Sequence, residues 1–154
     1  MLFRSADGRL KKIEFPGGTV QSLCEVLTPA GGSWSRTGVI LFGQLEVGLS
    51  RISATGGEVI RVTTPDRSRQ EFSHRFPAFL PDGQRFLYNV QSGQMDTRGV
   101  YLGSLDGTVK RRLLADDTMI RYMAAVPGHK ASGADWLLFG RDSDLAKARL
   151  FWRQ

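Results

Sequence analysis

Cysteine and histidine are scarce in this 154-residue chain, which has one cysteine, Cys24, and two histidines, His74 and His129. A single cysteine excludes an intramolecular disulfide and leaves the redox compartment open. These three residues also lack the close pairing of zinc ligands, so no metal site is predicted. Cys24 itself is expected to be a small, buried apolar residue.

Long hydrophobic runs are also missing. No segment approaches the ~18 apolar residues of a membrane-spanning helix, so no membrane span is predicted. The first eight residues lack a charged region followed by an apolar stretch, so no signal peptide is expected in this chain. If the protein is exported, we expect its signal to lie outside this chain.

A sustained 3.6-residue apolar period is absent as well, which disfavours helices. Glycine is abundant instead, with 18 residues. Most of these glycines lie between short apolar runs, where turns need positive φ. The pattern predicts an all-β fold of short antiparallel strands joined in local hairpins. A helical turn over 142–147 is the one exception that we consider.

The net charge of the chain is +6, from 21 Lys+Arg and 15 Asp+Glu. Such a balance favours anionic partners in general, such as nucleic acid, membrane headgroups or acidic proteins. However, the basic residues are scattered, and the densest run is only Lys110-Arg111-Arg112. Because no clustered basic stripe is present, solvated surface charge is favoured over nucleic-acid binding.

Three stretches of the chain repeat one another. Val39–Phe42, Arg85–Tyr88 and Trp136–Phe139 are short apolar strands, each followed by a second strand. The spacing between their aromatic ends is about 46 to 51 residues, and propeller blades repeat at ~40–45 residues, more with loop insertions. The period therefore predicts one four-stranded antiparallel sheet per repeat.

One copy of the repeat is specific enough to suggest a family. The segment 79–88 contains the tight turn Pro81-Asp82-Gly83, and the segment 99–107 ends in an Asp-Gly turn. Together they resemble the PD40 repeat of WD40-like, TolB-type β-propellers, and are similar to the propeller region of bacterial eukaryotic-like serine/threonine protein kinases. The resemblance extends over 10–151, although Ser35-Arg36-Thr37-Gly38 replaces the Pro-Asp-Gly turn in the preceding copy.

This resemblance implies that residues 1–154 form a single partial β-propeller of about three four-stranded blades. Two blades are complete, at 32–63 and 73–115, and parts of two others lie at 10–26 and 119–152. Closed propellers typically have 4–8 blades, and open sheet edges are normally covered. We therefore expect either a fragment of a longer protein, which we favour, or a homo-oligomeric ring.

Catalytic motifs are not found in the sequence. There is no Gly-rich phosphate loop, His-Arg-Asp or Asp-Phe-Gly motif of a kinase, and no Gly-x-Ser-x-Gly elbow of a serine hydrolase. The chain is therefore predicted to be non-catalytic and to have no cofactor. Asp142 and Asp144 have the spacing that starts a calcium loop, but the following ligand positions are not filled, so a solvated turn is favoured.

His74 and Arg75 are the candidate binding residues. We expect them to enter the innermost strand of the best-matching blade and to face the central channel. In the alternative, which we favour, both are structural: Arg75 pairs with a carboxylate and His74 bonds a loop carbonyl. Aromatic residues are expected to pack within the blades: Trp34, Phe76, Phe79, Trp136 and Trp152.

The predicted function is a non-catalytic scaffold or binding module that contacts a protein or small ligand through its loops or channel. The kinase resemblance implies the sensor part of a receptor-like kinase, which would be extracytoplasmic in a membrane kinase. The alternative is a propeller that accompanies a prolyl-oligopeptidase-like serine hydrolase. Ligand, partner, compartment and total blade number stay open.

Overall fold

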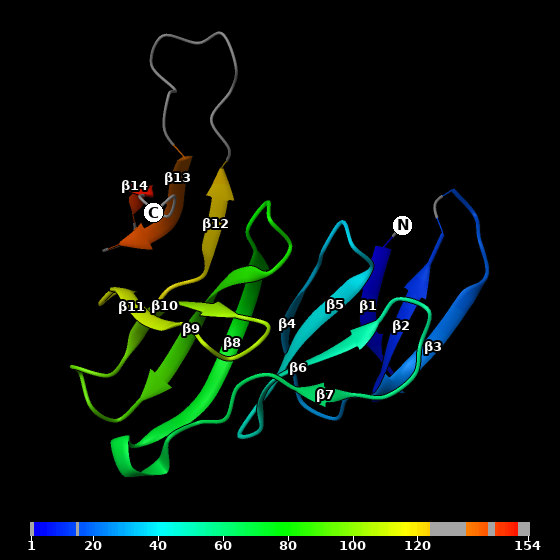
Figure 1. Ribbon diagram of the computed structural model, residues 1–154, viewed down its shortest axis with the longest axis horizontal. Coiled ribbons are helices and arrows are strands. Elements are labelled where there is room, and N and C mark those ends of the chain that lie inside the picture. The colour runs from blue at the N-terminus through cyan, green and yellow to red at the C-terminus, as the bar shows by residue number, and fades with distance from the viewer. Residues whose placement is uncertain (1, 15, 124–134, 142–143, 151–154) are drawn as a thin grey trace, which may run out of the picture.

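Short antiparallel strands make up most of the computed structural model, which describes residues 2–14, 16–123, 135–141 and 144–150. Within these residues there are fourteen strands and one 3₁₀ turn, η1 (Arg67–Arg69) (Figure 1). The strands are β1 (Leu2–Ala6), β2 (Arg9–Ile13), β3 (Val20–Glu25), β4 (Pro29–Trp34), β5 (Val39–Gln44), β6 (Gly48–Ser53), β7 (Ile60–Arg61), β8 (Glu71–Phe79), β9 (Arg85–Ser92), β10 (Gly99–Ser104), β11 (Lys110–Leu114), β12 (Ile120–Met123), β13 (Asp135–Arg141) and β14 (Asp144–Leu150). No helical segment of the described residues is long and apolar enough to cross a membrane.

The strands form four sheets that follow one another along the chain. Sheet A has the order β1-β2-β3, sheet B β4-β5-β6-β7, sheet C β8-β9-β10-β11 and sheet D β12-β13-β14. Every pairing is antiparallel and joins strands that are consecutive in the sequence. The predicted all-β class is thus confirmed, with four antiparallel sheets in chain order.

Two segments differ from the sequence-based expectation. The proline and glycines of Pro29–Gly32 are typical of a loop, yet this segment begins β4, whose pairing with β5 is irregular between Pro29 and Gly32. Gly31 has a φ of 87° at this irregularity, so the strand continues through a bulge that reads as a loop in the sequence. The helical turn considered over 142–147 is wrong for its described part, because Asp144–Leu150 pairs with β13 along its length.

Layers of apolar side chains lie between neighbouring sheets. They form because successive side chains on a strand point to opposite faces of its sheet. On β5, Ile40 and Phe42 face the cluster shared with sheet A, whereas Leu41 belongs to the cluster shared with sheet C. A strand buried on both faces reads as a continuous apolar run, which is why Val39–Phe42 shows no polar alternation. A third cluster joins Leu87 and its neighbours in sheet C to sheet D.

Aromatic side chains fill much of the layer between sheets B and C. The ring of Phe86 lies 5.6 Å from Tyr88 and 6.4 Å from Phe79, and Tyr88 lies 5.8 Å from Tyr101. The expected packing role of Phe79 is visible in this group, and Trp34 packs against the cluster between sheets A and B. Trp152 and the loop 127–134 lie outside the described residues.

The alternating strand directions define two ends of the molecule. The connectors into β4 and β8 and the turns after β5 and β9 share one end, which we call the connector end; its segments are 26–28, 45–47, 62–70 and 93–98. The opposite, tight-turn end has the segments 35–38, 54–59 and 81–84. Figure 1 shows η1 and the β5–β6 turn at the lower edge and the β4–β5 and β8–β9 turns at the upper edge.

Sheets B and C come into backbone contact along β8. Leu45 forms an isolated antiparallel bridge with Ser73. A Cβ atom on Gly43 would lie 3.0 Å from the carbonyl oxygens of both Ala30 and His74. Glycine therefore allows β5 to approach β4 and β8 closely, and this contact positions the residues described next.

Candidate functional site

His74 is at the centre of a buried polar cluster where sheets B and C meet. Its side chain is 1% exposed, with Nδ1 2.7 Å from Thr63 Oγ1 and Nε2 3.0 Å from Glu71 Oε2. The backbone N–H of Leu49 donates to Thr63 Oγ1 at 3.0 Å. We assign the Thr63 hydroxyl as the donor and His74 Nδ1 as the acceptor. The other ring nitrogen then carries the hydrogen, so Nε2–H donates to the Glu71 carboxylate and every group in the series is satisfied.

Glu71 is fully buried and receives three further hydrogen bonds. The backbone N–H of Asp66 donates to Oε2 at 2.9 Å, and Lys110 Nζ donates to Oε1 at 2.9 Å and Oε2 at 3.2 Å. Burial alone would raise the pKa of Glu71, but the hydrogen bonds from His74, the Asp66 amide and Lys110 outweigh burial and lower the pKa to about 2. Glu71 is therefore a carboxylate at neutral pH.

The connector 62–70 aims Glu71 into this cluster through local turn chemistry. Asp66 caps η1, since its Oδ1 accepts the backbone N–H of Ser68 at 3.0 Å. Gln70 then takes a φ of 54°, and the N–H of Glu71 bonds the Asp66 carbonyl at 3.0 Å. The chain thus reverses just before β8 and places Glu71 three residues ahead of His74.

Arg75, the second candidate residue, does not join this cluster. It is half-buried, and its Nε donates to Ser73 Oγ at 3.0 Å. Adjacent residues on a strand point to opposite faces, so Arg75 and His74 do not act together. Within the described part of the chain Arg75 has no ion pair, in contrast to the expected carboxylate partner.

A small pocket of about 170 Å³ lies beside the cluster. Its walls include Thr63, His74, Tyr88, Ser104 and Lys110. The series of hydroxyl, imidazole and carboxylate has the composition of an acyl-transfer triad. However, the Thr63 hydroxyl is bonded on both sides, and Glu71 is neutralised by Lys110. This arrangement favours a structural junction that holds the connector against sheet C.

The sequence-based interpretation missed Glu71, Thr63 and Lys110 as partners of His74. Thr63 lies in the connector 62–70 and Lys110 on β11, eleven and more residues from His74, and no local motif links them to it. The available signal was Glu71 itself, a carboxylate that comes three residues before His74 on the same strand. His74 bonds this carboxylate and a hydroxyl instead of the expected loop carbonyl, and the proposed contact of His74 with a ligand stays a prediction.

Metal binding has no support in the described geometry. Across residues 2–14, 16–123, 135–141 and 144–150, no group of three His, Cys, Asp or Glu side chains could hold a metal ion. Of the carboxylates considered for a calcium loop, Asp144 begins β14 and Asp142 lies outside the described residues.

Comparisons with known proteins do not identify the chain. No protein-family model matches it, and no curated protein matches its sequence. The resemblance to PD40 repeats therefore stays a prediction that depends on the segments 79–88 and 99–107.

Proposed function

We propose that the chain is a non-catalytic binding module built from propeller-like blades, with the connector end as its docking surface for a protein. Consecutive antiparallel meanders with apolar layers between them support the blade arrangement. In such an arrangement the buried strands are a rigid scaffold, and the turns at their ends are free to contact a partner.

The distribution of exposed apolar residues is the observation that carries this proposal. Five of the eight exposed large hydrophobic residues of the described chain lie in a segment of the connector end, directly before the first strand of a sheet, or in the first two residues of such a strand: Leu27, Leu45, Phe72, Met95 and Met119. Leu27 is 78% exposed and Met95 83%. Apolar side chains gathered at one end of a molecule are typical of a protein interaction site.

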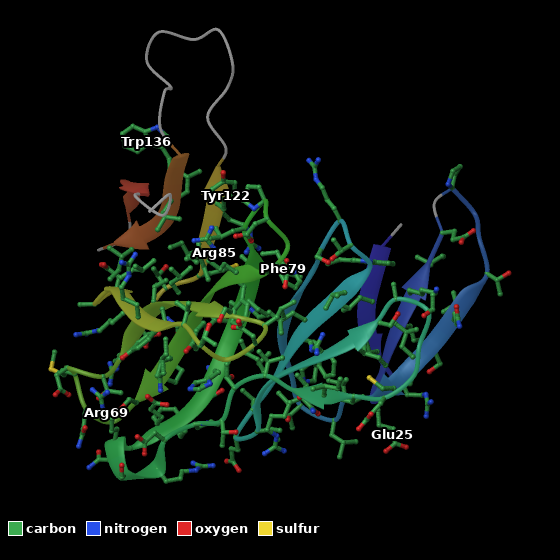
Figure 2. All side chains as sticks on the ribbon, in the orientation of Figure 1. Glu25, Arg69, Phe79, Arg85, Tyr122 and Trp136 are labelled. Atoms are coloured by element: carbon green, nitrogen blue, oxygen red, sulfur yellow. The ribbon has the colours of Figure 1, made fainter. Side chains whose placement is uncertain are left out.

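Arginine side chains accompany these apolar residues. Arg112 Nη2 donates to the carbonyl of Met95 at 2.8 Å, and Arg67 Nη2 donates to the carbonyl of Glu46 at 3.2 Å. Arg69, the last residue of η1, is exposed at the end of the molecule away from Phe79 (Figure 2). Arginine and methionine are both enriched in protein interfaces, so the expected partner surface is apolar with an acidic rim.

The parent protein that we favour is a receptor-like serine/threonine kinase, of which this module would be the sensor part. The repeat at 79–88 supports this choice through its resemblance to propeller regions of such kinases. No feature of the described residues favours the serine-hydrolase alternative.

Site-specific photo-crosslinking tests the docking surface. A photoreactive phenylalanine analogue is placed at Phe72 or Met95, with Val20 and Val59 as matched controls, because these valines are 54% and 41% exposed but belong to the tight-turn side of the sheets. We expect a discrete adduct in the producing cells from positions 72 and 95 only. Equal labelling at all four positions, or none, would contradict the proposal.

A further inference from the structure

Arg51 has an unusual position at the tight-turn end of sheet B. It lies on β6 opposite Leu41, on the face that points toward sheet C. Its guanidinium makes no hydrogen bond or ion pair with the described residues, and its Nε is their only buried side-chain polar atom without a partner. Buried donors in folded proteins are almost always satisfied, so a group from outside the chain is expected to bond Arg51.

The Arg51 side chain lines a pocket of about 270 Å³. Apolar and polar groups share its walls: Thr37, Val39, Arg51, Ile52, Glu58 and Ile60. A Cβ atom on the lining residues Gly38 or Gly56 would meet nothing within 4 Å, so these glycines leave the space open. The pocket is slightly below the ~300 Å³ at which most ligand sites begin, which limits an occupant to a few heavy atoms.

We propose that this pocket binds a small organic carboxylate through Arg51. The planar guanidinium fork matches a carboxylate and bonds it through two parallel N–H groups. Val39 and Ile60 provide an apolar wall for a short alkyl tail. Glu58, which has no ion pair in the described residues, adds a negative charge to the pocket and disfavours a doubly charged phosphate.

This site is independent of the proposed docking surface. The pocket is built from the β4–β5 turn, β6 and the β6–β7 loop at the tight-turn end, whereas the exposed apolar residues gather at the connector end. Failure of one proposal therefore leaves the other untouched.

Nuclear magnetic resonance titration of the whole chain with butyrate tests the site, with the backbone amide signals of the lining residues Gly38 and Gly56 as the readout in every variant. We expect a saturable shift with a dissociation constant on the order of millimolar, as suits a ligand of few atoms. Arg51→Gln should weaken binding about tenfold or more, because hydrogen bonds to a charged group are lost. Arg51→Lys should be intermediate, since lysine lacks the fork. Arg75→Gln, at another half-buried arginine, is the matched control and should bind butyrate as the original chain does.

Inorganic phosphate is the second probe. We expect the original chain to prefer butyrate, and Glu58→Gln to gain affinity for phosphate because the repelling charge is removed. Preference for phosphate in the original chain would overturn the carboxylate assignment. A linear, non-saturating shift would show that butyrate does not bind in the pocket, and equal binding by Arg51→Gln would show that binding does not use Arg51; either result would overturn the proposal. The backbone spectrum of each variant verifies that it folds. If Arg51→Gln does not fold, the proposal is tested by the butyrate affinity of Arg51→Lys and the phosphate affinity of Glu58→Gln.

Discussion

Among single residues, Glu71 illustrates how one buried charge can organise its surroundings. Its carboxylate is buried and bonded by His74, the Asp66 amide and Lys110. A buried carboxylate is stable only while these donors remain, since removal of one partner of a buried pair is strongly destabilising. The junction between sheets B and C therefore depends on ionisation of this one group.

The lowered pKa of Glu71 leads to a pH prediction. The group titrates near 4.3 in an unfolded chain and at about 2 in the folded one, so the unfolded state binds more protons between these values. The stabilisation is complete above about pH 5 and is lost as the pH falls toward 2, with a total of roughly 3 kcal/mol. Urea denaturation from pH 7 to pH 2 measures this loss.

Glu71→Gln is the control for this pH dependence. Glutamine cannot titrate, so the variant should be less stable at pH 7 and lose less free energy of unfolding on acidification than the original chain. Parallel pH profiles of the two proteins would show that Glu71 does not contribute in the proposed way.

Thr63 and Thr64 form a matched pair for a second test. Thr63 bonds both Leu49 N–H and His74, whereas Thr64 is exposed. Thr63→Val should lower the free energy of unfolding by about 1–3 kcal/mol, because it leaves buried groups unsatisfied. Thr64→Val should change it by less than ~0.5 kcal/mol, as at ordinary surface sites. Equal effects in chemical denaturation would count against a structural role of the hydroxyl.

Among the structural elements, the β8–β9 turn shows how a short motif fixes a hairpin. Asp82 Oδ1 accepts the backbone N–H groups of Gln84 at 3.0 Å and Arg85 at 2.9 Å, and Oδ2 accepts from Arg85 Nε at 2.6 Å. Gly83 has a φ of 65°, as the predicted tight turn requires.

Removal of the Asp82 acceptor should weaken this hairpin. We expect Asp82→Ala to reduce the free energy of unfolding by about 1–2 kcal/mol, because two backbone donors lose a partner. Asp82→Asn keeps one side-chain oxygen and should restore at least half of that loss. Thermal denaturation of the three proteins distinguishes these values, and identical stability of the alanine variant would contradict the importance of the turn.

Most strands and turns were predictable because their signals are local. The apolar run Val39–Phe42 and the Asp82 turn each determine the structure of their own few residues. The bulged start of β4 was missed because the pairing of Pro29 with Gln44 lies outside the segment itself. Likewise, the local sequence near Asp144 suggested a helical turn, but pairing with strand β13 makes Asp144–Leu150 a strand. Sites are harder to predict, because the partners of His74 and the isolation of Arg51 depend on how sheets B and C meet.

For the whole molecule, the central claim is that consecutive sheets pack as neighbouring blades. Sheets A, B, C and D share apolar clusters pairwise, and β8 connects sheets B and C through the Leu45–Ser73 bridge. The proposed docking surface depends on this arrangement, since it brings the connectors of neighbouring sheets to one end, whereas the carboxylate pocket is lined by residues of sheet B and its turns alone.

The most direct measurement of this claim is a nuclear Overhauser spectrum of the isotopically labelled chain. We predict backbone cross-peaks between Leu45 and Ser73 and between Gly31 and Phe76, where a Cβ atom on Gly31 would lie 3.0 Å from Phe76 Cα. Cross-peaks between Ile40 and Ile52, paired within sheet B, are the internal reference. Reference peaks without the two peaks between sheets would mean that the sheets form but do not pack as blades, and would contradict the account.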